Sequence, residues 1–517
     1  MDRALELLES FSFPKIDKKE VMPIVSIAAA TTILFASYRL LTSNKKNKQG
    51  YKEIPVPGSS YPYVGHILSL GDLPGRKVSE WHKELGPLIK LKMGVHTWIM
   101  VDDPEIAHKI FVSNGVEASY RPHSTYGYDQ YSMGGKGVVF AQPTAGWKQG
   151  RAAVLSVLAP KQIEKYMDSI HKESKDLVSR LMQSTKDESE VNPFKFLELN
   201  SMNVILTAAF GKRFDSVQDP EFYRIATMIE TGMKFGGLEN DLPNFLPVIS
   251  IFDYMAGTQA KQRYYLKHER DPIYIKLIKD AATRDGPNVI KSLVENGFHF
   301  TDEEKLVLMS DFIAAGTDTV SVTLSWNIAI MCHHPEVQKA VSAEIDEFIR
   351  LNGRTPVFTE RTQLPYCVSV IKECMRFRPT TPFGLPHTTH NDLDIDGYII
   401  PKGATIISNM DSMHKQSKLY PEPEKFMPER FINNLKTMQA SANGKLEDRD
   451  HFNFGWGRRI CPAIYLAEVE IFSAFIQIFS RCFVEPTSEG MPDIVGAKNA
   501  GLTIWPLPYK VKFTERV

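Results

Sequence analysis

The sequence predicts a mostly helical fold with a small β-sheet region, preceded by a single N-terminal transmembrane helix. Several long segments carry apolar residues at helical spacing, whereas alternating strand patterns are few and short. An uncharged apolar run near the N-terminus is long enough to cross a bilayer. No repeat or low-complexity tract divides the remaining chain, and its 43% hydrophobic content is sufficient for one large core.

The N-terminal apolar run, residues 21–38, contains no charged side chain. Arg39 and three lysines follow it, whereas the charges before it nearly cancel, so the positive-inside bias leaves the rest of the chain in the cytoplasm. We therefore expect a lumenal segment at 1–20 and a signal anchor at 21–41. A cleaved secretory peptide is the alternative, but the run is long for one and no obvious cleavage site follows it.

The segment after the anchor, residues 42–60, is basic and rich in proline and glycine, including Pro55, Pro57 and Gly58. These residues favour a stiff, turning linker over a helix or a paired strand. We expect the globular domain to follow at 61–517.

The remaining elements follow from hydrophobic periodicity and turn residues. Helical spacing predicts helices at 163–182, 194–210, 303–331, 335–351 and 463–479. Strand patterns occur near 87–103 and near 393–408, where Asp396 and Gly397 predict a hairpin turn.

Charge and cysteine content exclude several classes of protein. Lys+Arg and Asp+Glu number 61 each, so there is no basic excess of the kind found in nucleic-acid binders. An odd number of cysteines without C-x-x-C spacing does not fit a disulfide framework or a structural zinc site. They are Cys332, Cys367, Cys374, Cys461 and Cys482. Cys332 adjoins His333 and His334, but neighbouring positions on a helix point in different directions, which argues against a metal site there.

The segment 303–331 is long enough to be a second membrane span or a buried core helix. Asp311 and Asp318 favour the core helix, because carboxylates are costly at the middle of a bilayer. Within it, "AAGTDT" at 314–319 is unusual, since Gly316 weakens a helix by about 1 kcal/mol relative to alanine. A polar stripe or a kink is one interpretation. An acid beside an alcohol in an apolar cleft, able to relay protons, is the other.

The stretch "FGWGRRICPA", residues 454–463, places Cys461 directly before an expected helix. Pro462 would occupy the first helical position, so the sulfur would lie at the positive end of the helix dipole, where the pKa of a thiol is lowered. Gly455 and Gly457 permit a tight turn that brings backbone N–H groups toward the sulfur.

Three interpretations of Cys461 compete. A nucleophilic cysteine would need a nearby base, and the local sequence offers only His451. A dinucleotide fingerprint would need a third glycine where Ile460 stands. The third is an axial thiolate ligand of haem iron, with Arg459 close enough in sequence to meet a carboxylate of the same cofactor.

The stretch resembles the haem-binding signature of the cytochrome P450 superfamily, F-x-x-G-x-R-x-C-x-[GA], in its microsomal, membrane-anchored form. The residues at its fixed positions are Phe454, Gly457, Arg459, Cys461 and Ala463. The resemblance extends in order from about residue 50 to the C-terminus. It implies the cytochrome P450 fold, haem b as cofactor and Cys461 as the ligand of the iron.

Two further segments resemble a structural clamp of that family. Glu373 and Arg376 match its E-x-x-R pair, which by itself indicates only a surface ion pair of about 0.2–0.5 kcal/mol. Arg430, in "FMPERF", matches the arginine that joins the pair. Together they imply a clamp beneath the haem.

Other residues resemble the family's contacts to the haem propionates. Trp147 and Arg151 match its W-x-x-x-R motif. His387, in "PH", matches a further propionate contact, although many relatives have arginine at this position.

Residues 315–319 are similar to the family's oxygen-activation motif [AG]-G-x-[DE]-T-[TS]. The resemblance places Ala315 at the haem and implies that Asp318 and Thr319 deliver protons to bound dioxygen. Val320 departs from the last, polar position, so the hydrogen bonding of that turn is expected to differ, although Ser321 follows directly.

The sequence contains no flavin or nicotinamide fingerprint, so electrons must come from another protein. The resemblance implies NADPH-cytochrome P450 reductase, with cytochrome b5 as a further donor, and a single-pass protein of the endoplasmic reticulum membrane with a monomeric, cytoplasmic catalytic domain. Lys148 and Arg458 are candidate contacts for the reductase. We expect no nucleic-acid partner.

Residues 119–140, 234–252 and 500–505 match family segments that line the substrate pocket. Their aromatic and aliphatic side chains indicate a lipophilic substrate, such as a steroid, a terpenoid or a fatty acid, with a lean toward steroid hydroxylation, although the same aromatics also suit an ordinary core. The alternatives are a haem-thiolate isomerase or dehydratase that acts on a pre-oxidised lipid, and a haem sensor or carrier without turnover. The acid and alcohol at 318–319 favour oxygen activation over both.

Overall fold

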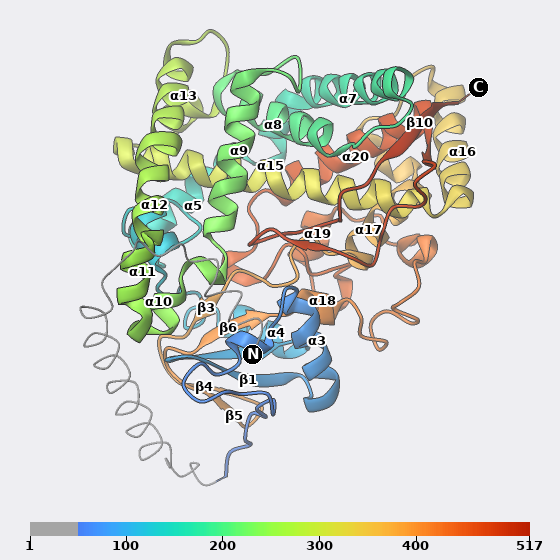
Figure 1. Cartoon of the computed structure of the whole chain (residues 1–517). Helices are drawn as coiled ribbons and strands as arrows, with labels where there is room; N and C mark the ends of the chain where they lie inside the picture. Colours follow the sequence, from blue (N-terminus) through green and yellow to red (C-terminus); the bar gives the residue numbers. More distant parts are fainter. Residues whose placement is uncertain (1–49, 517) are drawn as a thin grey trace.

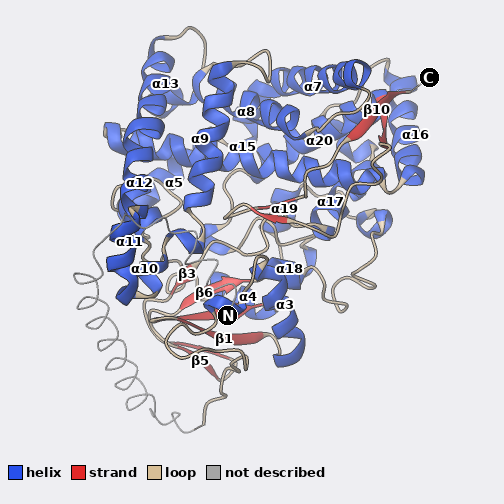
Figure 2. Ribbon diagram, in the orientation of Figure 1, coloured by secondary structure: helices blue, strands red, loops and turns tan. Residues whose placement is uncertain are grey.

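The structure, a computed structural model, describes residues 50–516. Long helices form its larger part, strands β1 to β6 gather at one end, and β10 lies at the far side near the C-terminus (Figures 1 and 2). The predicted lumenal segment at 1–20 and signal anchor at 21–41 lie outside the described residues. The mostly helical fold with a small sheet region is as predicted.

The central helix α15, Asp302–Cys332, crosses the middle of the molecule (Figure 1). A capping box starts it: the Thr301 hydroxyl accepts from the Glu304 amide at 3.2 Å, and the Glu304 carboxylate accepts from the Thr301 amide at 2.8 Å. It is the one helix among the described residues that is long and apolar enough to cross a membrane, and 72% of its most apolar window is buried inside the protein. The core-helix interpretation is therefore favoured.

Most helices begin at a proline or at a capping residue, as the start signals in the sequence require. Their bounds are α3 Pro74–Leu85, α4 Pro104–His108, α5 Ala145–Val157, α6 Pro160–Ile163, α7 Met167–Glu188, α8 Phe194–Phe210, α9 Pro220–Phe235, α10 Leu242–Phe245, α11 Ser250–Ala256, α12 Thr258–Tyr265, α13 Asp271–Thr283, α14 Val289–Glu295, α16 Pro335–Asn352, α17 Pro365–Phe377, α18 Met410–Met413, α19 Met438–Ala442 and α20 Ile464–Arg481.

The strands form one four-stranded sheet and three two-stranded ones. The larger sheet has the order β1, β2, β6, β3, with β2 and β6 parallel and the other pairs antiparallel. The strand bounds are β1 Leu88–Met93, β2 His96–Val101, β3 His387–Thr388, β4 Leu393–Ile395, β5 Tyr398–Ile400, β6 Thr405–Ser408, β7 Cys482–Pro486, β8 Lys498–Asn499, β9 Ile504–Trp505 and β10 Val511–Glu515. The predicted turn joins β4 to β5, with positive φ at Asp396 (54°) and Gly397 (83°).

The largest hydrophobic core lies among the helices, around α8, α15 and α20, and two smaller clusters lie on the sheet. The second half of the expected linker touches the sheet end: the Lys52 amide donates to the Gly397 carbonyl at 2.8 Å, and Ile54 is buried. The cavity described next lies between the helical core and the sheet end.

Candidate active site

One cavity of about 1590 Å³ extends along α15 toward the segment that carries Cys461. This volume exceeds that of an ordinary ligand pocket, roughly 300–1,000 Å³, so it has room for a cofactor and a substrate together. The predicted site residues that line it are Arg151, Ala315, Thr319, His387, Phe454, Arg459, Cys461 and Ala463. Trp147, Asp318 and Gly457 do not line it.

The loop before Cys461 is held by a tight turn. The short 3₁₀ helix η11, Gly457–Arg459, precedes the cysteine, whose amide donates to the Phe454 carbonyl at 2.9 Å. Gly457 has φ +51°, and a Cβ there would lie 2.2 Å from the Phe111 carbonyl oxygen. The turn therefore requires glycine at this position.

Two expectations about Cys461 were wrong in detail. Helix α20 begins at Ile464, after a turn at Pro462 and Ala463, so the proline is not its first residue. Burial raises the pKa of the free thiol, and the Ala463 amide and Arg151 lower it only in part. The helix dipole alone therefore does not ionise the Cys461 thiol, because burial of the sulfur has the larger effect on its pKa.

The metal chemistry available to Cys461 is that of a single protein ligand. Across residues 50–516, no group of three or more His, Cys, Asp or Glu side chains is placed to hold a metal ion. Beside Cys332, His333 contacts the Pro492 carbonyl and His334 contacts Glu336. One thiol in an apolar wall suits an iron whose other ligands come from a macrocycle.

Arg459 crosses from the cysteine loop to the opposite wall. Its guanidinium donates to the backbone carbonyls of Ser119 (2.9 Å), Val138 (3.1 Å) and Ala141 (2.6 Å) and lies 4.3 Å from the centre of the Trp147 ring. The Trp147 Nε1–H donates to the Val138 carbonyl, so the propionate contact expected for this residue stays a prediction.

Arg121 joins this cluster and was not singled out from the sequence. It is 7% exposed, lines the cavity, and donates to the carbonyls of Val139 (2.9 Å), Leu385 (3.1 Å) and Pro386 (2.8 Å). The signal available was one arginine in an otherwise aromatic stretch, which is weak without the fold.

His387 lies beside the same arginines. Its Nδ1 contacts the Ala118 carbonyl at 2.6 Å, and its ring packs on Phe111. Burial, together with Arg121 and Arg459, lowers the pKa of His387 well below its usual value, so the imidazole is neutral.

The arginine cluster has the charge that haem propionates require. Burial and mutual repulsion lower the pKa of Arg459 to about 8 and that of Arg121 to about 9, and burial also lowers the pKa of Arg151. Within the described residues, no carboxylate forms an ion pair with any of the three. Since pKa values of about 8 and 9 still leave Arg459 and Arg121 protonated at neutral pH, this cluster of one buried and two half-buried arginines fits an anionic partner. A cofactor with carboxylate arms meets that requirement.

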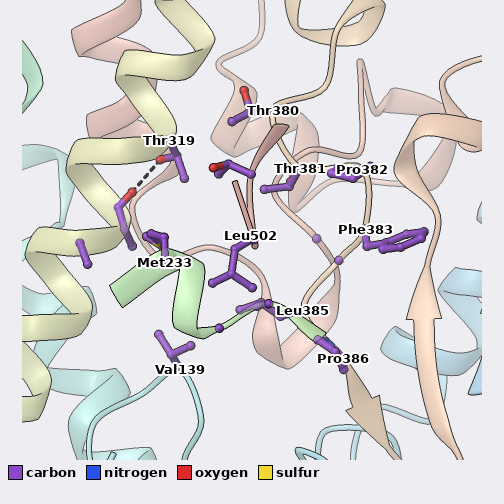
Figure 3. A pocket seen from close by; sticks show the side chains of 18 of the residues that line it. Val139, Met233, Thr319, Thr380, Thr381, Pro382, Phe383, Leu385, Pro386 and Leu502 are labelled. Atoms are coloured by element: carbon purple, nitrogen blue, oxygen red, sulfur yellow. Dashed lines mark hydrogen bonds between the residues drawn. The ribbon is translucent and has the colours of Figure 1, made fainter. Parts of the chain in front are cut away.

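The acid and the alcohol on α15 face different surroundings. Thr319 lines the cavity, and its hydroxyl donates to the Ala315 carbonyl at 2.7 Å (Figure 3). Asp318 is buried behind it, where its carboxylate accepts from the Thr503 hydroxyl at 2.7 Å. Burial raises the pKa of Asp318 to about 6. Only the alcohol of the pair therefore meets the cavity directly.

Gly316 is explained by the close packing of α8 on α15. A Cβ at Gly316 would lie 2.7 Å from Cδ1 of Ile205, so a larger residue would require the Ile205 side chain to shift. The cost of glycine within the helix is thus offset by this packing.

The three predicted clamp residues come together in the buried interior. Arg376 donates to both carboxylate oxygens of Glu373, at 2.7 and 2.8 Å, and Arg430 donates to one of them at 3.1 Å. Glu373 and Arg376 are 0% and 1% exposed, so this is no surface ion pair. The Met427 amide also donates to Glu373, which ties the clamp to the segment before the cysteine loop.

The chain resembles known proteins over most of its length. The sequence model of the family described as Cytochrome P450 matches residues 55–513. Cytochrome P450 1A1 of Oryzias latipes is 27% identical, covering 90% of this chain and 91% of the relative. Steroid 17-alpha-hydroxylase/17,20 lyase of Felis catus is 28% identical, covering 89% and 94%.

Solved structures agree with this match. A zebra fish cytochrome P450 solved with progesterone has a TM-score of 0.70 and 26% identity, covering 86% of this chain and 99% of that one. The family model spans well over half of the sequence, and Cys461 lies within the matched range. This chain therefore belongs to the cytochrome P450 family and is a P450 monooxygenase.

Proposed function

We propose that this protein inserts one oxygen atom of O₂ into a C–H bond of a lipophilic, steroid-like substrate. The second oxygen atom leaves as water, with two electrons supplied by NADPH through a separate flavoprotein reductase and two protons delivered through the enzyme. One observation carries the proposal: Cys461 and Thr319, from different elements, line one cavity whose wall also holds buried and half-buried arginines that pair with no carboxylate of residues 50–516.

The cofactor that fits this site is haem b, with Cys461 as iron ligand and Arg121, Arg151, Arg459 and His387 around its propionates. Bound there, haem b would supply the iron chemistry that activates O₂, with the thiolate donating electron density that favours O–O cleavage. The chain's own contribution is to exclude water around the sulfur and to neutralise the carboxylates.

Proton delivery falls to the residues on α15. The Thr319 hydroxyl donates to a backbone carbonyl within its own helix, from which it can turn to donate into the cavity. Asp318 and Thr503 form a buried hydrogen-bonded pair behind it, and a carboxyl with a pKa of about 6 exchanges protons near neutral pH. We infer that Asp318 holds the proton and Thr319 passes it on.

The substrate class rests on the cavity wall and on the relatives. Val139, Met233, Phe383, Leu385 and Leu502 present apolar side chains around it (Figure 3). A feline relative is named as a steroid hydroxylase, and a zebra fish relative was solved with progesterone. A steroid-like substrate is therefore favoured over a terpenoid or a fatty acid.

The redox partner and the membrane complete the proposal. Lys148 is exposed on α5, whereas Arg458 is half-buried and contacts Ser119 and Trp147, so Lys148 is the better candidate for a reductase contact. We place the protein in the endoplasmic reticulum membrane through an anchor at 21–41, with a linker at 42–60 and the catalytic domain at 61–517 in the cytoplasm.

The decisive experiment uses the purified full chain and its reductase. Haem content, the absorption of the reduced protein with carbon monoxide, and NADPH consumed per hydroxylated product are measured with steroid, terpenoid and fatty-acid substrates. A thiolate-type spectrum with NADPH-dependent hydroxylation of a steroid supports the proposal. A colourless protein, a histidine-type spectrum, or conversion that needs no reductase contradicts it, and the last of these would indicate an isomerase or a dehydratase.

The anchor has its own test. Deletion of residues 1–41 should leave a folded haem domain that associates more weakly with membranes. Carbonate extraction of membranes that contain each form measures this. A truncated form that stays fully integral contradicts the assignment of the anchor.

A further inference from the structure

We propose, on the basis of the function above, that one end of the cavity is a hydroxyl subsite that orients an elongated lipid alcohol for oxidation at its other end. The subsite consists of Tyr126, Arg270, Ser310 and Asp311, which lie on three separate elements and line the same cavity. The Tyr126, Ser310 and Asp311 side chains each hold a buried polar atom that makes no hydrogen bond with a described residue.

The two carboxylate oxygens of Asp311 have different surroundings. Its Oδ2 accepts from the amides of Val138 (2.8 Å) and Val139 (3.2 Å), which fixes the loop before α5. Its Oδ1 is buried and makes no hydrogen bond of good geometry with a residue in 50–516. Burial raises the pKa of Asp311 to about 6, although the amides of Val138 and Val139 and the nearby Tyr131 side chain lower it in part. At neutral pH the carboxylate is therefore an acceptor with capacity for a further donor.

Arg270 supplies the complementary donor. It is 1% exposed, its Nη1 donates to the Tyr131 carbonyl at 2.7 Å, and its Nε donates to Asp271 at 2.7 Å. Its Nη2 also lies 2.7 Å from Asp271 but makes no hydrogen bond, so it retains N–H groups to offer. Arg270 and Asp271 together are neutral.

Tyr126 closes the subsite next to a glycine of α9. A Cβ at Gly232 would lie 2.7 Å from the Tyr265 hydroxyl and 3.5 Å from the Tyr126 hydroxyl. The Tyr265 hydroxyl is satisfied by the Met228 carbonyl at 2.7 Å, whereas that of Tyr126 is not satisfied. The close approach of Tyr265 thus requires glycine at this position, and the neighbouring Tyr126 hydroxyl has no partner among the described residues.

The chemistry of these groups selects an alcohol. A substrate hydroxyl can donate to Asp311 and accept from Arg270 or Tyr126 at the same time, whereas a ketone can only accept and would leave the carboxylate unpaired. A substrate carboxylate would place a second negative charge beside Asp311. A hydrocarbon end would leave every polar atom unsatisfied.

The position of the subsite defines the orientation of the substrate. Asp311 precedes Thr319 by eight residues, so the two lie about 12 Å apart along α15. A substrate held by its hydroxyl at Asp311 must therefore reach along the helix to present its far end beside Thr319. The expected product carries the new oxygen at the end remote from the original hydroxyl.

The test compares three steroids that share one carbon skeleton and bear a hydroxyl, a ketone or only hydrogen at one terminal position. Each is titrated into the haem-loaded full chain while the haem spin state is recorded. Because a hydrogen bond to a charged group contributes about 1.5–3 kcal/mol, the hydroxysteroid should bind roughly 10- to 100-fold more tightly than the deoxysteroid. Product analysis then locates the oxidised carbon.

The Asp311→Asn variant reverses the hydrogen-bonding pattern at the subsite. Its amide oxygen can keep the Val138 contact while its NH₂ becomes a donor toward the cavity, so the preference should shift from the hydroxysteroid to the ketosteroid. Asp302→Asn, at the fully exposed start of the same helix, is the matched control and should keep the original preference. Should Asp311→Asn lose haem, Tyr126→Phe replaces it and should reduce the hydroxyl preference.

Equal affinity of the wild type for the hydroxysteroid and the deoxysteroid would overturn the subsite and indicate that ordered water satisfies these groups. An unchanged preference in Asp311→Asn would also overturn it. Either result leaves the monooxygenase proposal intact, since that proposal fails only if the thiolate spectrum or the NADPH-dependent product is missing.

Discussion

The Asp318 carboxylate accepts a hydrogen bond from the Thr503 hydroxyl at 2.7 Å, which links α15 to the loop directly before β9. The Trp505 indole N–H donates to the same Thr503 oxygen at 3.1 Å. The C-terminal segment thus holds the Asp318 carboxylate away from the cavity. The properties of Asp318 depend on residues about 185 positions later in the chain.

Asp318→Asn should stabilise the protein at alkaline pH while it impairs turnover. Burial raises the pKa of Asp318 from 3.8 to about 6, so this group stabilises the folded state fully only below about pH 4, and that contribution is lost as pH rises through about 6. At 1.36 kcal/mol per pKa unit, the variant should gain up to about 3 kcal/mol relative to the wild type near pH 8. Chemical unfolding at pH 4 to 8 measures the difference.

The exposed control Asp302→Asn should follow the pH dependence of the wild type, because its carboxylate is fully accessible. The free energies of unfolding of Asp318→Asn and the wild type should differ more as pH rises. A difference that stays constant with pH would show that burial of the Asp318 carboxylate does not destabilise the folded state.

Thr319→Ala should keep haem but divert electrons from product to hydrogen peroxide. The variant removes the cavity-facing hydroxyl, whose loss should lower the productive rate by about 10²–10⁴ if it passes a proton. Thr319→Ser keeps a hydroxyl and should restore much of the coupling. The ratio of product to NADPH consumed measures the effect, and equal coupling in all three proteins would refute the role of Thr319.

The sequence was most informative where local signals were strong. Helix α8 has the predicted bounds, because Pro193 precedes it and Gly211, at φ 64°, ends it. The turn at Asp396 and Gly397 was likewise predicted from its residues. The helix expected at 163–182 begins only at Met167, because a 3₁₀ turn interrupts an apolar spacing that reads as continuous.

The site was predictable as far as its motifs are local. Cys461 and Thr319 belong to short, specific patterns, whereas Arg121 reaches the cavity through a loop whose path depends on the whole fold. The side of α15 that Asp318 faces is set by packing against the C-terminal segment. The prediction that the pKa of Cys461 is lowered was wrong for the same reason, since burial is a property of the tertiary structure.

Glu373→Ala should destabilise the domain by about 3–5 kcal/mol, because it leaves the buried guanidinium of Arg376 without its carboxylate. Haem should be lost at lower denaturant concentrations in parallel, since the clamp also holds the Met427 amide. Unfolding followed by fluorescence and by haem absorption measures both. Glu347→Ala, which breaks the exposed pair with Arg350, is the control and should change stability by less than about 1 kcal/mol. Equal effects of the two substitutions would contradict the clamp.

Gly457→Ala should distort the cysteine loop and release haem, whereas Gly455→Ala should do so far less. Both glycines have positive φ, +51° and +75°, so alanine strains the backbone at each by about 1–3 kcal/mol. Only at Gly457 does the added Cβ also meet another atom, the Phe111 carbonyl oxygen at 2.2 Å, while a Cβ at Gly455 has no atom of the described residues within 4 Å. Haem content after purification and the carbon monoxide spectrum separate the two variants. If Gly455→Ala loses haem as completely as Gly457→Ala, backbone strain alone accounts for the loss. The close approach to Phe111 would then have no role in holding Cys461 in place.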